Sequence, residues 1–224
     1  MPRNARCVLP GLPYHVTQRG SNRQRVFFAP SDYKMYLSLV RDQIEDSGTR
    51  ILAYCLMTNH VHLVVVPERA DSLAVLFRRV HGRYAQYLNT RRRRTGHLWQ
   101  QRFFSCPLSE SRHWVAIRYV EQNPCRALMA SAPGLYRWSS AGVHLGEAKD
   151  RLGLLDVAYW QKAGGPETWR ELHASGDGTG EVALLRRCTY AGRPFGDEEF
   201  LVALEERFQR SWRRWGFENR AASA

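Results

Sequence analysis

The chain has 224 residues and carries 33 Lys and Arg against 21 Asp and Glu, which gives a formal net charge of +12. Its length fits one substantial domain with an appendage, or two small domains, and 44% hydrophobic residues suffice for a packed core. The sequence has no apolar run long enough to span a membrane and no apolar N-terminal stretch of the kind that marks a signal peptide, which excludes membrane proteins. Its five cysteines are scattered without a CxxC pair, which excludes disulfide scaffolds and zinc knuckles. We therefore expect a cytoplasmic protein.

Periodicity in the first half of the chain predicts strands that alternate with helices. The expected elements are, in chain order, a strand at residues 14–19, a helix from Ser31 or Asp32 to Gly48, strands at 50–58 and 60–67, a helix from Asp71 or Ser72, and a strand at 98–106. The short Thr58-Asn59 junction favours an antiparallel hairpin. This βαββαβ order predicts an α+β, ferredoxin-like fold, in which an antiparallel sheet has its helices on one face.

The third predicted strand carries two histidines two residues apart. Successive side chains of a strand point to opposite faces, so His60 and His62 share one face, about 7 Å apart along the backbone. Two neutral imidazoles at this spacing can bind one divalent metal. A pair of buried core histidines without a metal is the alternative.

The chain beyond the fourth strand predicts further helices. The first begins at Ser109 or Ser111 and should end before Pro124, because the residue before a proline is disfavoured in the helical conformation. A glycine-rich, linker-like stretch and a last amphipathic segment follow. We therefore divide the chain into a main domain, residues 1–145, and a C-terminal helical extension, residues 146–224, that could bind DNA.

The helix predicted to end before Pro124 offers a nucleophile. A tyrosine hydroxyl such as that of Tyr119 can attack a phosphodiester, which forms a phosphotyrosine and frees a 3′-hydroxyl. Asn123 lies four residues later on the same face, where its amide oxygen could be a third metal ligand, and Glu121 and Gln122 are the alternatives. Tyr119 could instead only pack on the sheet.

The net charge comes almost entirely from arginine, because Lys34, Lys149 and Lys162 are the only lysines. Guanidinium groups pair bidentately with phosphate and stack on bases, and aromatic residues lie beside many of these arginines. Charge combined with stacking surface is typical of proteins that bind single-stranded nucleic acid, whereas a solvated, arginine-rich surface is the simpler alternative. The candidates for contact are Arg19, Arg23, Arg25, Arg78, Arg79, Arg83, Arg91, Arg92, Arg93 and Arg94.

Five sequence segments occur in the order typical of one family. They are GLPYHVTQRG at residues 11–20, MTNHVHL at 57–63, HLWQQRFF at 97–104, YVEQNPCRA at 119–127 and YRWSS at 136–140. Together they resemble the single-tyrosine HUH transposases of the IS200-like type, and among these the REP-associated tyrosine transposases. A weaker resemblance to the family's C-terminal extension covers AGRPFG at residues 191–196.

The resemblance implies that His60 and His62 bind the metal and that Tyr119 is the nucleophile. IS200-type members use a glutamine one turn after the tyrosine, whereas this chain has Asn123 there, so Asn123 is the candidate third ligand. The implied metal is Mg²⁺ or Mn²⁺, which acts as a Lewis acid on the scissile phosphate. The implied partner is single-stranded DNA next to a hairpin. The REP-associated branch is monomeric, whereas other relatives pair to form composite sites, so we expect a monomer and keep a dimer as the alternative.

Three functions are compatible with this sequence. The leading hypothesis is a metal-dependent, single-strand-specific DNA endonuclease and strand transferase that cuts near REP-like hairpins through a 5′-phosphotyrosine. The alternatives are a catalytically silent regulator that binds DNA hairpins and an RNA-binding protein, because ferredoxin-like sheets with aromatic strands also bind RNA. Matched DNA and RNA hairpins would separate these hypotheses.

Overall fold

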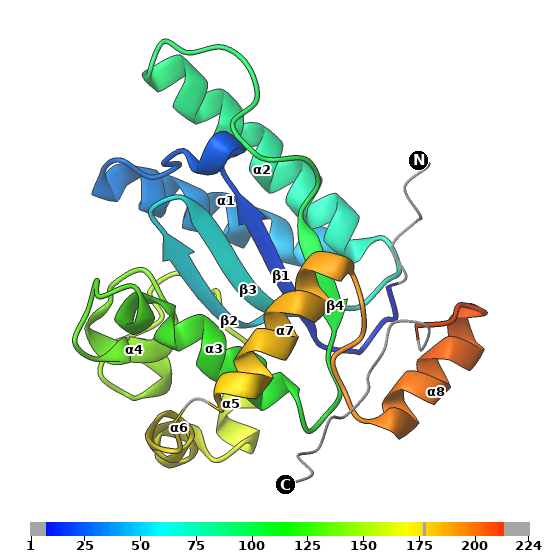
Figure 1. Cartoon of the computed structure of the whole chain (residues 1–224). Coiled ribbons are helices and arrows are strands. Elements are labelled where there is room, and N and C mark those ends of the chain that lie inside the picture. The colour runs from blue at the N-terminus through cyan, green and yellow to red at the C-terminus, as the bar shows by residue number, and fades with distance from the viewer. Residues whose placement is uncertain (1–7, 177, 213–224) are drawn as a thin grey trace, which may run out of the picture.

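Residues 8–176 and 178–212 are described by a computed structural model of the chain (Figure 1). Four strands, β1 (Tyr14–Arg19), β2 (Thr49–Met57), β3 (His60–Pro67) and β4 (Phe104–Pro107), form one antiparallel sheet in the order β2-β3-β1-β4. Helices α1 (Pro30–Ser47) and α2 (Ser72–Arg91) connect them. The predicted ferredoxin-like arrangement is confirmed, with β1 in the interior of the sheet.

Helix α1 ends at the predicted Gly48 but begins at Pro30, slightly before the predicted start at Ser31 or Asp32. Pro30 occupies the first turn, where its missing N–H costs nothing, and the Asp32 carboxylate accepts hydrogen bonds from the backbone N–H groups of Phe28 and Ala29 at 2.9 and 3.0 Å. Gly48 ends the helix at φ 57°, a left-handed conformation that favours glycine. These local signals fix the length of the crossover between β1 and β2.

The fourth strand is shorter than predicted. It covers only Phe104–Pro107, and the preceding aromatic residues leave the sheet and pack toward α2. The Trp99 indole N–H donates to the His81 carbonyl at 3.1 Å, and the Phe103 ring lies 4.8 Å from that of Phe77. Burial of these rings therefore overrides the strand propensity of the segment. Phe103 is buried in the core that α1 and α2 share with the sheet.

Helix α3 (His113–Arg126) continues through Pro124, contrary to prediction. A proline inside a helix leaves the carbonyl four residues earlier without its usual donor. Here the Asn123 side-chain amide donates to that carbonyl, the one of Val120, at 3.4 Å. The helix then extends beyond the proline, since the Ala127 N–H donates to the Asn123 carbonyl at 3.0 Å.

The second half of the chain is helical, as predicted, but it is more continuous. The stretch predicted as a linker is short, because α6 reaches residue 174 and α7 begins at residue 179. The predicted amphipathic segment forms α8, which ends at residue 208, and Trp212 lies buried beyond it. Residues 213–224 lie outside the described residues. The short and C-terminal helices are η1 (Ser21–Arg23), η2 (Pro133–Leu135), α4 (Ala141–His144), α5 (Val157–Lys162), α6 (Gly165–Ala174), α7 (Thr179–Ala191) and α8 (Glu198–Phe208).

Helices cover both faces of the sheet. Alternate strand residues such as Val16 and Val61 pack with α1 and α2, as the ferredoxin-like pattern predicts. His15, His62 and Val64 point to the opposite face, where α3 and α7 lie across the strands (Figure 1). We call this second side the α3/α7 face. Helix α7, from beyond the predicted boundary at residue 145, contributes to the same core as β4 and α3.

Two further features concern the described residues as a whole. None of their helices is both long and apolar enough to cross a membrane. Cys55, Cys106, Cys125 and Cys188 are all free thiols, so no disulfide links the described parts of the chain.

Candidate active site

The histidine pair lies at the start of β3, on the α3/α7 face. His60 is aligned with Arg19 of β1, and His62 with Thr17, so the pair sits beside the end of the first strand. The two imidazole centroids are 4.9 Å apart at an interplanar angle of 82°. His62 is buried, whereas His60 is partly exposed. The two imidazole rings can therefore contact one small site from two directions.

The hairpin turn fixes which nitrogen of His60 carries a proton. The Asn59 amide nitrogen donates to the Arg23 carbonyl at 3.1 Å, so the Asn59 amide oxygen faces the His60 Nδ1, 2.6 Å away. An amide oxygen only accepts, so Nδ1 must donate, and Nε2 of the neutral ring keeps its lone pair. Nε2 of His60 is thus free of a proton and chemically able to bind a metal.

Both histidines are neutral at physiological pH. Burial, followed by the charges of Arg19 and Arg186, lowers the pKa of His60 to about 4. Burial and the neighbouring imidazoles hold the pKa of His62 well below its usual range. A neutral imidazole can give its lone pair to a cation without first losing a proton.

His15 of β1 lies against the second histidine. Its Nε2 is 2.9 Å from Nδ1 of His62, and its Nδ1 is 2.8 Å from the hydroxyl of Thr189 on α7. Burial lowers the pKa of His15 to about 3. Sequence reasoning missed Thr189, which lies 174 residues further along the chain.

Tyr119 reaches this site from α3. Its ring meets those of His62 and His15 edge-on, with centroids 5.4 and 5.6 Å away. The guanidinium of Arg126 lies 4.6 Å from the Tyr119 ring centroid. Sequence reasoning missed Arg126 and also Arg186. Burial raises the pKa of Tyr119, and the charges of Arg186 and Arg126 oppose that rise. The predicted nucleophile and the predicted metal ligands therefore share one site, with positive charge beside them.

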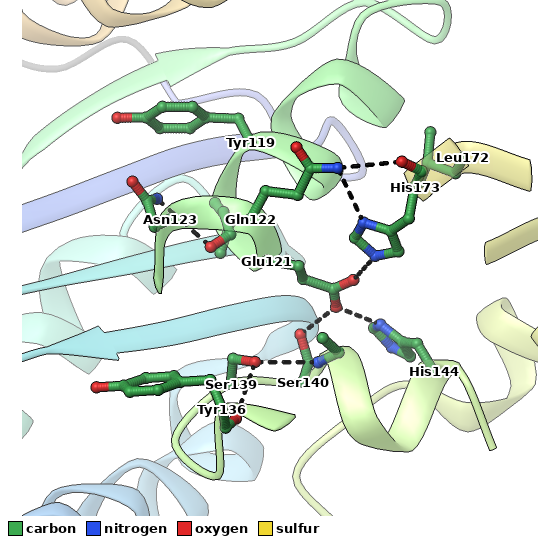
Figure 2. Close-up of polar contacts among 12 residues, drawn as sticks. Tyr119, Glu121, Gln122, Asn123, Tyr136, Ser139, Ser140, His144, Leu172 and His173 are labelled. Carbon is green, nitrogen blue, oxygen red and sulfur yellow. Dashed lines mark hydrogen bonds and ion pairs between the residues drawn. The ribbon is translucent and has the colours of Figure 1, made fainter. Parts of the chain in front are cut away.

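Asn123 lies on the Tyr119 side of α3, whereas Glu121 and Gln122 point away from it (Figure 2). Because the Asn123 amide nitrogen faces the Val120 carbonyl, its oxygen is the end available to a cation. Gln122 contacts His173 instead. The alternative third ligands, Glu121 and Gln122, are both engaged in contacts away from the histidine pair, Glu121 with His144 and His173 and Gln122 with His173.

Glu121 is the centre of a buried polar cluster on the far side of α3 (Figure 2). Its carboxylate accepts from the Ser140 hydroxyl and pairs with His144 Nδ1 at 2.6 Å and with His173 Nε2 at 2.9 Å. Burial alone would raise the pKa of Glu121, but the two imidazoles outweigh it and hold that pKa at about 2. The cluster ties the helix that carries Tyr119 to α4 and α6.

The donor set fits a divalent cation of borderline softness. His60 offers an imidazole lone pair, His62 a second imidazole, and Asn123 an amide oxygen. Mixed nitrogen and oxygen donors suit Mn²⁺ better than Mg²⁺, which prefers oxygen ligands and retains its water. Within residues 8–176 and 178–212, no three His, Cys, Asp or Glu side chains are grouped to hold a metal, so an asparagine or a substrate oxygen would have to complete this set.

The predicted arginines fall into two groups. The arginines that follow β1 and those that follow α2 lie together at the end of the sheet that carries His60. The backbone from residue 96 to residue 100 runs beside residues 19–24, and Arg94 donates a hydrogen bond to Gln24. Arg78, Arg79 and Arg83 lie on α2, the helix that packs on the opposite face of the sheet. Of these three, Arg79 pairs with Asp46 at 3.1 Å.

Comparisons with known proteins agree with this architecture. The sequence profile of the family described as "Transposase IS200 like" matches residues 9–123. The solved structure of a REP-associated tyrosine transposase bound to a REP hairpin aligns with 70% of this chain and 90% of its own, at 17% identity and a TM-score of 0.57. A Deinococcus radiodurans protein provisionally classed as a transposase aligns with 54% of this chain and 97% of its own, at 18% identity and a TM-score of 0.38. No curated protein sequence matches the chain. At these identities the first structure supports the fold alone.

Proposed function

The chain belongs to the IS200-like transposase family, and from this premise we propose that it is a metal-dependent nickase and strand transferase of single-stranded DNA. One observation carries the proposal: Tyr119 from α3 and the His60–His62 pair from β3 meet in one buried site. The similar REP-associated transposase is bound to a REP hairpin, which supports hairpin-containing DNA as the substrate here. Such a reaction fits the cytoplasm, where the four described thiols stay reduced.

The Tyr119 hydroxyl oxygen forms the new bond to phosphorus, and the bond from phosphorus to the 3′ oxygen breaks. The phenol loses a proton and the leaving 3′ oxygen gains one, so the step conserves both protons and phosphodiester energy. His60, His62 and Asn123 would hold Mg²⁺ or Mn²⁺, which supplies Lewis acidity at the scissile phosphate. Because burial raises the pKa of Tyr119, its hydroxyl stays protonated until substrate binds.

Positive side chains beside the nucleophile would hold the phosphate. Arg126 lies over the Tyr119 ring, and the charges of Arg19 and Arg186 act on the site. Such cations stabilise the charge that develops on the phosphate during attack. They also give an approaching single strand a continuous electrostatic guide toward Tyr119.

The test is covalent capture. We expect purified protein to form an adduct with labelled single-stranded DNA hairpins of varied flanks when Mn²⁺ or Mg²⁺ is present, and to form none with a chelator. Denaturing gels would read the adduct, and matched RNA hairpins would serve as controls. Shifted but uncut DNA in every flank and metal condition would instead indicate a silent hairpin-binding regulator, and a preference for RNA would indicate an RNA-binding protein.

We also expect the arginines next to the site to contribute more to DNA binding than those on α2. Arg92 and Arg93 are exposed just beyond the end of α2, and their joint replacement by alanine should reduce the salt dependence of single-strand affinity by about 1.4 logarithmic units per decade of salt. The matched control replaces Arg78 and Arg83, equally exposed on α2. Equal losses in fluorescence anisotropy titrations would contradict this placement of the strand.

A further inference from the structure

We propose that His15 and Thr189 form a hydrogen-bonded relay that fixes the protonation of His62, so that its Nε2 lone pair faces the metal site. The inference rests on the proposed function, because it concerns how a metal ligand is prepared. It adds to that function two positioning residues, one from β1 and one from α7. Thr189 lies outside the residues that match the family profile, which end at residue 123.

The relay is a continuous chain of buried contacts. Thr189 Oγ1 is 2.8 Å from the Leu185 carbonyl oxygen and 2.8 Å from Nδ1 of His15. Nε2 of His15 is 2.9 Å from Nδ1 of His62. The three side chains of Thr189, His15 and His62 are 1%, 1% and 3% exposed, so bulk water does not replace these partners.

One end of this chain has a fixed direction, and it determines the rest. A carbonyl oxygen only accepts, so in this arrangement the single hydroxyl proton of Thr189 points to Leu185, and the Cys106 thiol, 3.2 Å from the same hydroxyl oxygen, donates to it. The same hydroxyl must then accept from His15, whose proton therefore lies on Nδ1. In a neutral imidazole the other nitrogen is an acceptor, so Nε2 of His15 accepts from Nδ1 of His62. His62 is left with its lone pair on Nε2.

A charged histidine does not fit the relay. A doubly protonated His15 or His62 would be a buried cation, and no carboxylate hydrogen-bonds to either ring among the described residues. Burying an ion without a counter-charge is strongly unfavourable. Both rings are therefore neutral, as the assignment requires.

The two metal ligands are thus prepared by independent devices. The Asn59 amide sets His60 from the hairpin turn, and the Thr189 hydroxyl sets His62 from the C-terminal half of the chain. Hydrogen-bond partners of metal-bound imidazoles affect metal affinity by about 10- to 100-fold. Loss of the Thr189 hydroxyl removes the acceptor for Nδ1 of His15. The opposite arrangement, in which Nε2 of His15 donates and Nε2 of His62 holds the proton, then becomes favourable.

The decisive variant is Thr189→Val, which keeps the shape and removes the hydroxyl. In metal-free wild type, long-range ¹⁵N–¹H NMR of labelled histidines should show His62 protonated on Nδ1. In Thr189→Val the proton should move to Nε2, and calorimetric titration should show Mn²⁺ affinity reduced about 10- to 100-fold. Thr189→Ser should restore both readouts to wild-type values.

The control is His81→Gln. His81 is also a buried histidine, but it bonds to the Tyr36 hydroxyl at 3.0 Å among the residues that pack with α1 and α2. This variant should leave the His62 proton and Mn²⁺ affinity unchanged. If Thr189→Val does not fold, Thr189→Ala provides the same comparison.

The outcomes separate this inference from the proposed function. A proton on Nε2 of His62 in metal-free wild type, or an unchanged proton position in Thr189→Val, would overturn the relay. Wild type that shows the expected tautomer but binds no Mn²⁺ would support the relay and contradict the metal-dependent function.

Discussion

Tyr119→Phe is expected to reduce covalent adduct formation by about three orders of magnitude or more, because the variant lacks the hydroxyl oxygen proposed to attack phosphorus. DNA affinity should change by less than about twofold, since the ring keeps its contacts with His62 and with the Arg126 guanidinium. Adduct yield on denaturing gels and affinity by anisotropy would measure the two effects on the same protein preparation.

Tyr190→Phe is the matched control for this experiment. Tyr190 lies on α7 with 41% of its surface exposed and contributes to the raised pKa of Tyr119, so it is a second phenol near the same site. The Tyr190 variant should form adduct at the wild-type rate. If instead the adduct survives in Tyr119→Phe and disappears in Tyr190→Phe, the nucleophile has been assigned to the wrong helix.

Glu121→Gln is expected to lower the free energy of unfolding by about 3 kcal/mol, because it removes the charge of a fully buried carboxylate and leaves donors of His144 and His173 without it. Chemical denaturation at neutral pH would measure the loss. The exposed pair of Glu45 with Arg41 offers a control, and Glu45→Gln should cost less than about 1 kcal/mol. A loss as small as that of Glu45→Gln would show that the cluster is not a structural anchor.

The pH dependence of stability should report the same carboxylate. The pKa of Glu121 is about 2 in the folded protein, below its ordinary value of 4.5, so its contribution is present above pH 4.5. That contribution is lost as the pH falls from about 4.5 toward 2, because the carboxylate is then protonated. Glu121→Gln has no such group, so its stability should fall less steeply than that of wild type within this window.

The sequence predicted those parts of the fold whose signals are local. Gly48 ends α1, and the apolar run after Asn59 forms β3 with the predicted bounds, because turn residues and periodicity determine both. The end of α3 was not predictable in this way. Pro124 normally terminates a helix, and only the three-dimensional contact of the Asn123 amide with the Val120 carbonyl shows how this helix continues.

In the candidate site, too, the residues with local sequence signals were predicted and those placed by tertiary packing were not. The spacing of His60 and His62 and the family motif around Tyr119 identified its centre. Arg186 and Thr189 could not be found from spacing, since α7 reaches the site only through tertiary packing on β4 and α3. Glu121 shows the converse error. Its position beside Tyr119 in sequence suggested a ligand, whereas its helical rotation places it in a buried anchor (Figure 2).

The packing of α7 on the sheet also affects when the site can form during protein synthesis. His15 and Thr189 are 174 residues apart, and a ribosome that adds about 5–20 residues per second needs about 9 to 35 s to make the interval between them. Throughout that interval the nascent chain has its first strand but lacks the hydroxyl that orients the proposed relay. The proposed metal site would thus be completed late in synthesis, after α7 has been made and has packed on the sheet.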